Sequence, residues 1–160
     1  MVTTALARTH RPEPDLVFVA MPFGTKPLNG IDGATCDFDR IYPIIADTIR
    51  SAGLRSERLD EVYGPTGLID LVWQCIQRAT IVVFDLTTKN HNVTLELGLA
   101  LALGKKIVMI TQNTADVPSD YRGHRVLTYG LQYDRVEKLK VSLKKQLQAT
   151  LAEPSTERAW

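Results

Sequence analysis

From residue 15 onward, short apolar runs alternate with segments in which apolar residues recur every three or four positions. The first run, residues 16–21, is continuous, contains two β-branched valines and stops at Pro22, which is typical of a strand buried on both faces. Further strands are predicted at 54–59, 80–86, 106–111 and, more weakly, 125–129. Apolar residues at helical spacing predict helices at 37–53, 68–79, 92–104 and 134–152. Turn-forming residues predict a long loop at 23–36.

Capping and breaking residues mark where two of these helices begin. Asp37 and Asn92 have side chains that accept hydrogen bonds from free backbone N–H groups, so each is predicted to cap a helix. Pro43 lies inside the first helical pattern and is expected to kink that helix or mark its true start.

The alternation of strands and helices predicts an α/β fold with a mainly parallel sheet, right-handed crossovers and helices on both faces. Five strands favour a flavodoxin-like three-layer domain with strand order 2-1-3-4-5. Residues 15–152 are expected to form this single domain, because 160 residues suit one core. The polar segment 1–14 and the end 153–160 are expected to be flexible.

Composition excludes several classes of protein. With 19 Lys and Arg against 18 Asp and Glu, the net charge of +1 lacks the basic excess of a dedicated nucleic-acid binder. The apolar runs are too short to cross a membrane, and residues 1–13 contain no secretory signal core, so we expect a cytoplasmic protein. Cys36 and Cys75 have no nearby metal-type ligands, so free thiols and no metal site are expected.

The predicted strand order locates a site before any motif is considered. In such sheets, ligands bind outside the carboxyl ends of the strands where the winding reverses, here between the first and third strands. The residues at those ends are Met21, Pro22, Phe23 and Gly24 after the first strand, and Asp85 in the third, with 90–96 beyond. Phe23 could stack on a base and Gly24 could let a ligand approach the backbone, or the two could simply form a tight turn.

Glu96 is the notable residue of this group, because the helix that carries it is apolar nearly all round. Glu96 could form an ion pair with a basic side chain at the edge of the helix, or it could lie on a narrow solvent-exposed strip of the helix surface. Close to the helix N-terminus, however, the ionised carboxylate is favoured, and such a group can attack an anomeric carbon or stabilise a sugar cation.

Four ordered segments carry a family resemblance: residues 18–24, 38–42, 58–61 and, above all, 90–98, Asn-His-Asn-Val-Thr-Leu-Glu-Leu-Gly. Together they resemble the nucleoside 2-deoxyribosyltransferase-like family, which overlaps in fold with TIR-like NAD-cleaving domains. The resemblance implies that Glu96 is the nucleophile or the carboxylate that steadies the sugar cation. Separately, Arg58 and Asp60 at the end of the second strand could reach ribose hydroxyls or phosphate, or could form a solvated salt-bridged loop.

The chain departs from the transferases at one informative position. They carry an Asp six residues before the nucleophile to protonate the leaving base, whereas this chain has Asn90. Nicotinamide leaves NAD as a neutral molecule and needs no acid, so the change favours NAD-type substrates. If a proton is required, Asp85 is the expected donor, since burial and repulsion from Glu96 would raise its pKa; its alternative role is to cap loop amides.

The sequence thus predicts an N-glycosidase, a hydrolase or glycosyltransferase, that acts on NAD, a nucleoside or a nucleoside monophosphate. Asn90 and Asn92 are expected to contact this small-molecule substrate. No cofactor is expected, although NAD is a possible substrate. The protein is expected to form a homo-oligomer. The alternative is a nucleotide-sensing or TIR-like assembly module that binds without turnover.

Overall fold

A computed structural model of the protein describes residues 7–59 and 68–157. Its central sheet has five strands, all parallel, in the order β4-β1-β5-β6-β7. These strands are β1 (Leu16–Ala20), β4 (Arg55–Arg58), β5 (Ile81–Asp85), β6 (Lys106–Thr111) and β7 (Val126–Thr128). In chain order this is 2-1-3-4-5, so the predicted flavodoxin-like topology is confirmed.

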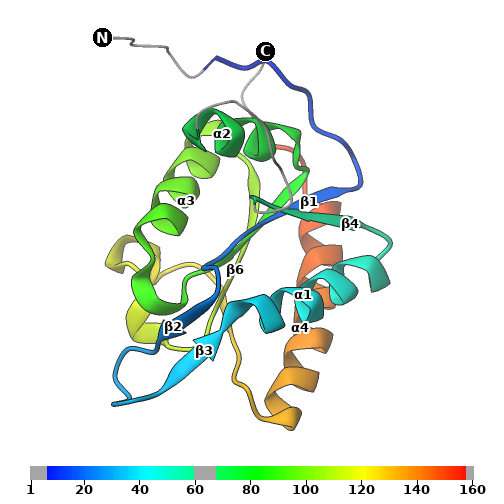
Figure 1. Ribbon diagram of the computed structural model, residues 1–160. Coiled ribbons are helices and arrows are strands. Elements are labelled where there is room, and N and C mark those ends of the chain that lie inside the picture. Colours follow the sequence, from blue (N-terminus) through cyan, green and yellow to red (C-terminus); the bar gives the residue numbers. More distant parts are fainter. Residues whose placement is uncertain (1–6, 60–67, 158–160) are drawn as a thin grey trace, which may run out of the picture.

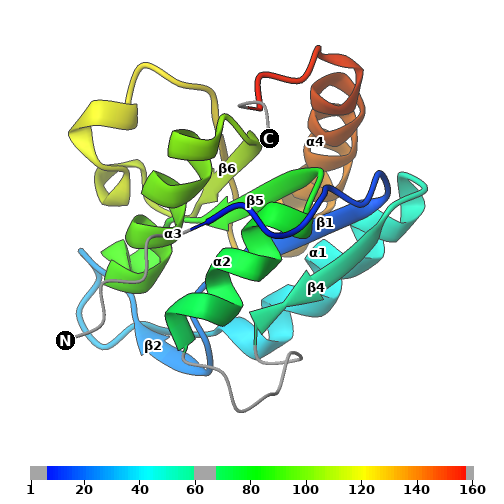
Figure 2. The same ribbon diagram turned by 90° about the horizontal axis from the view of Figure 1, so that it is seen from above.

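Within the described ranges, 7–59 and 68–157, four α-helices form the outer layers. They are α1 (Phe38–Ser51), α2 (Leu68–Arg78), α3 (His91–Leu103) and α4 (Tyr133–Ala152). The helices α1 and α4 cover one face of the sheet, and α2 and α3 cover the other (Figures 1 and 2). Because strand side chains alternate between faces, Val17 and Val19 pack toward α1 and α4, whereas Phe18 and Ala20 pack toward α2 and α3.

The predicted loop 23–36 contains a feature that the sequence pattern did not indicate. Strands β2 (Thr25–Pro27) and β3 (Thr35–Asp37) pair antiparallel as a small separate hairpin (Figure 1). Both strands are short, and all three residues of β2 are exposed, so no alternation of apolar and polar residues marks them. The hairpin follows directly on the carboxyl end of β1.

Helix starts follow the capping chemistry with two corrections. The Asp37 side chain accepts a hydrogen bond from the Asp39 N–H, as predicted, but α1 then continues through Pro43 without interruption. The start of α3 is capped by Asn90, not by the predicted Asn92: the Asn90 Oδ1 accepts from the N–H groups of Asn92 and Val93, at 3.0 and 3.3 Å. Asn92 is already inside the first turn, where it cannot cap.

Residues 7–14 and 153–157, expected to be flexible, make specific contacts at the amino-terminal end of the sheet. The Trp73 indole N–H donates to the Ala7 carbonyl at 2.8 Å, and Glu157 forms ion pairs with Arg8 and Lys105 at 2.9 and 2.6 Å. Residues 7–14 and 153–157 therefore lie near each other, on the side of the molecule away from the hairpin (Figure 1). Within the described residues, no helix is both long enough and apolar enough to span a bilayer.

Candidate functional site

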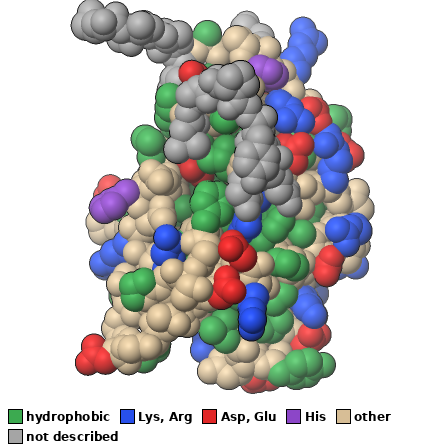
Figure 3. Space-filling view, viewed as in Figure 1, with side chains coloured by type: hydrophobic (Ala, Val, Ile, Leu, Met, Phe, Trp, Pro, Cys, Tyr) green, Lys and Arg blue, Asp and Glu red, His purple; other side chains and the backbone are tan. Residues whose placement is uncertain are grey.

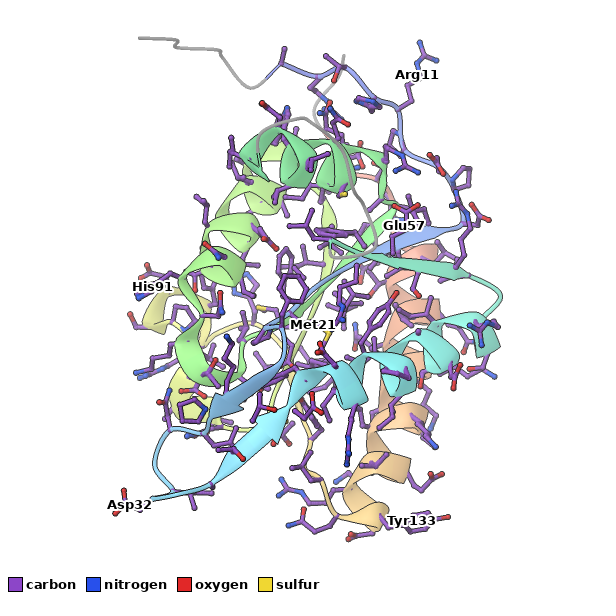
Figure 4. The ribbon with its side chains drawn as sticks, in the orientation of Figure 1. Arg11, Met21, Asp32, Glu57, His91 and Tyr133 are labelled. Atoms are coloured by element: carbon purple, nitrogen blue, oxygen red, sulfur yellow. The ribbon has the colours of Figure 1, made fainter. Side chains whose placement is uncertain are left out.

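A cavity of about 400 Å³ opens at the carboxyl end of β1, between the turn after that strand and the first turns of α2 and α3. Its lining residues are Phe18, Val19, Ala20, Met21, Pro22, Phe23, Leu59, Ile69, Val72, Asn90, Asn92, Val93, Leu95 and Glu96. Met21 lies near the middle of the molecule, where β1 ends (Figure 4). Figure 3 shows hydrophobic side chains gathered in the middle of this face, with acidic and basic side chains close below them. The location agrees with the edge at which the strand order predicts a ligand.

Glu96 lies in the second turn of α3, on the side that faces the sheet, and its exposed fraction is 6%. Within the described residues, its carboxylate forms no hydrogen bond and no ion pair. Burial alone therefore raises the pKa of Glu96 to about 7. A carboxyl group poised near neutrality in an apolar cavity has the properties expected of a catalytic or ligand-binding group.

The two asparagines line the same cavity near the start of α3. Asn90 uses its side-chain oxygen to cap the helix, so its carboxamide is held in place beside the cavity. Neither amide titrates, and among the described lining residues Glu96 is the only ionisable side chain. His91 lies on the outer side of the helix start, exposed to solvent (Figure 4).

The turn after β1 forms one wall of the cavity. Met21, Pro22 and Phe23 line it, and the Phe23 ring is 39% exposed. Gly24 does not line the cavity. It has a φ of +63°, which favours glycine, and its N–H donates to the Asp39 carboxylate at 3.1 Å, so it fixes the turn that presents Phe23.

Asp85, predicted as a site residue, does not line the cavity. It lies on the same side of β5 as Ile81 and Val83, which pack against α1 and α4, whereas Glu96 belongs to the layer on the other face. Its carboxylate accepts from the Thr87 hydroxyl and the Tyr129 hydroxyl, each at 2.5 Å. Burial raises the pKa of Asp85 to about 6, and the nearby Asp116 adds to the effect, so the predicted direction is found without Glu96 as its cause. Asp60 lies outside the described residues.

Replacing Asp85 with Asn should lower stability and leave base release by this chain largely unchanged. The Asn side-chain oxygen can still accept the hydrogen bond from Thr87, but its NH₂ group cannot accept the hydrogen bond from the Tyr129 hydroxyl. We therefore expect a loss of about 1–3 kcal/mol in the free energy of unfolding. Urea unfolding and base release would be measured on the same preparation. A folded Asp85→Asn protein that has lost its activity would instead place this carboxylate in the chemistry.

Sequence reasoning did not assign the apolar part of the wall to the site. Ile69 and Val72 belong to the apolar positions of the helix predicted at 68–79, but Ile69 is 43% exposed and both residues line the cavity. Leu59 and Leu95 complete that wall, and Leu95 is 53% exposed. An apolar residue on a stripe looks the same in sequence whether it meets the core or a ligand. Among the described residues, no three His, Cys, Asp or Glu side chains cluster as a metal site would require.

Comparison with known proteins adds evidence on the fold. No family model and no curated protein matches the chain. The solved structure of a CMP N-glycosidase, BcmB, from Clostridium botulinum matches with a TM-score of 0.54 and 16% identity over 79% of this chain and 98% of that one. Rubredoxin oxygen:oxidoreductase from Desulfovibrio gigas matches with a TM-score of 0.50 and 12% identity over 89% of this chain but 38% of that one. At these identities, the similarity establishes the shared fold, and the resemblance to TIR-like domains stays a prediction.

Proposed function

We propose that this chain cleaves the N-glycosidic bond of a nucleoside or nucleotide, with the Glu96 carboxylate acting at C1′ of the sugar. The observation that carries the proposal is the placement of Glu96: it is buried in the wall of an apolar cavity, at the sheet edge where ligands bind, with a pKa raised to about 7. The fold shared with a CMP N-glycosidase supports the same class of reaction.

In the proposed reaction, a Glu96 oxygen forms a bond to C1′ or stabilises the cation that develops there. The C1′–N bond breaks, and its electron pair leaves with the base. Water or an acceptor then forms a bond to C1′ as any Glu96–C1′ bond breaks, which frees the carboxylate. The proton lost by the water or acceptor passes to the departed base, or to solvent where the base leaves as a neutral molecule. The apolar walls exclude bulk water from the ionised group, which strengthens its interaction with the developing positive charge.

The leaving group is constrained by what the cavity holds. Glu96 is the only ionisable side chain among the described lining residues, so none of the other described lining residues can protonate a departing base. A base that is already cationic in the substrate, such as the nicotinamide of NAD, leaves as a neutral molecule. Nucleosides and nucleoside monophosphates are the other candidates, and the similarity to a CMP N-glycosidase favours including the latter.

A second candidate function rests on the same observation. A cavity in which Asn90 stands at the position where the transferases carry a proton-donating acid suits a sensor that holds a nucleotide and does not turn it over. The two functions differ in whether a bond breaks after binding.

The test is to incubate the protein with NAD, CMP and other monophosphates, ribonucleosides and deoxyribonucleosides, and to detect free base by mass spectrometry. We expect release from one class of substrate, and the free sugar or a transferred glycoside identifies the acceptor. Binding of a substrate without release would overturn the enzymatic proposal and favour the sensor.

The pH dependence of base release should report Glu96. If the ionised carboxylate is the active form, kcat/KM rises about tenfold per pH unit below the pKa of about 7 and levels off above it. The profile would be measured from pH 5 to 9 with stability checked at each point. A kcat/KM that falls as pH rises through 7 would assign the role to the protonated carboxyl group, as an acid.

A further inference from the structure

Arg58 is the last residue of β4 and is nearly buried, with an exposed fraction of 6%. It lies opposite Val19 of β1 in the parallel register, at the end of the edge strand beside the cavity turn. A buried guanidinium group requires partners that compensate for lost hydration, so its surroundings define its role.

The guanidinium lies between two aromatic rings and beside a carboxylate. Its central carbon is 5.0 Å from the Phe23 ring centroid and 4.7 Å from the Tyr42 ring centroid. Its Nη1 is 3.1 Å from an oxygen of Asp39, which also accepts the Gly24 N–H. We call this set of five residues the Arg58 clamp; it ties the turn after β1 to both α1 and β4.

Phe23 is the one member of the Arg58 clamp that also lines the cavity. An aromatic wall stacks on a planar base only if the ring is held in the right plane, since an unordered ring must lose rotamer freedom when the ligand binds. The Arg58 guanidinium holds one face of the ring by a cation–π contact and leaves part of the ring exposed.

We propose that Arg58 is a positioning residue that fixes the Phe23 ring as the wall against which the planar base of the substrate stacks. This inference rests on the proposed function for the identity of the ligand. Because stacking is made equally in the bound substrate and in the transition state, its loss raises KM and leaves kcat nearly unchanged. From the usual strength of base–aromatic stacking, we expect KM to rise about tenfold.

The test compares Arg58→Met and Arg58→Lys with Arg55→Met, a matched control on the same strand. Arg55 also carries ion pairs, with Asp15 and Glu13, but does not line the cavity. We expect Arg58→Met to raise KM about tenfold, Arg58→Lys to recover part of the loss because it keeps the charge without the planar group, and Arg55→Met to leave KM unchanged. Substrate dissociation constants are measured in parallel in a Glu96→Gln background, which needs no turnover.

Each outcome decides the proposal. A folded Arg58→Met protein with unchanged KM and binding overturns it, as does a fall in kcat at constant KM. If neither the wild type nor any variant releases base, but Arg58→Met still weakens nucleoside binding, the proposed reaction fails and the role of Arg58 stands. If no nucleoside or nucleotide binds at all, both fail. Should Arg58→Met not fold, Asp39→Asn at an exposed position loosens the same clamp, and an unchanged KM there overturns the proposal.

Discussion

Replacing Glu96 with Gln should lower base release by about a thousandfold or more, with binding of the substrate retained. Gln has nearly the same size and shape, so the cavity keeps its walls, but the amide can neither bond to C1′ nor offset a full positive charge there. Loss of a nucleophile that acts alone removes the whole covalent route, and effects of this size are typical of such residues. In this cavity, no other ionisable side chain among the described lining residues can take over.

The matched control for this experiment is Glu153→Gln, which makes the same chemical change at an exposed position at the end of α4. It should leave activity unchanged. Substrate binding to the Glu96→Gln protein would be measured by calorimetry, to show that the loss lies in the chemical step. A Glu96→Gln protein that releases base at the wild-type rate would remove Glu96 from the mechanism.

Replacing Lys105 with Met should lower the free energy of unfolding by about 3–5 kcal/mol. The Lys105 ammonium group is fully buried, donates to the carbonyls of Gln77 and Ala79 at 2.7 Å each, and pairs with Glu157 at 2.6 Å. Without it, two carbonyls at the end of α2 lose this donor, and Glu157 loses one of its two ion pairs among the described residues and keeps the one with Arg8. The terminal segments that meet there should loosen from the domain.

Lys106→Met is the matched control for this prediction. The next residue in the chain carries the same charge, but it is only partly buried and donates to the Leu151 carbonyl at 3.0 Å in an exposed contact, so its loss should cost less than about 1 kcal/mol. Urea unfolding of the two variants gives the comparison. Equal destabilisation by both would show that the buried contacts of Lys105 stabilise the fold no more than the exposed contact of Lys106 does.

The fold was predictable because the buried strands leave continuous apolar runs, and a run such as 107–110 is bounded by polar residues, Lys106 and Thr111. Glu96 stood out because it is a charge in an apolar helix. Asp85 illustrates the limit: it ends a strand and has a raised pKa, but the alternation of side chains turns it toward the other layer. For Arg58, the sequence predicts a ligand contact or a solvated loop, but not burial between Phe23 and Tyr42, because those two aromatic residues come from other parts of the chain.

The environment of Glu96 has a consequence for how this chain can change over generations. At pH values above 7, the folded protein must keep a charge in an apolar wall, whereas the unfolded chain keeps the same charge in water, so the residue weakens the fold. Selection for heat resistance alone would therefore favour Leu, Met or Gln at this position. Only selection for what the carboxylate does would retain Glu96, which makes turnover and robustness competing demands on a single side chain.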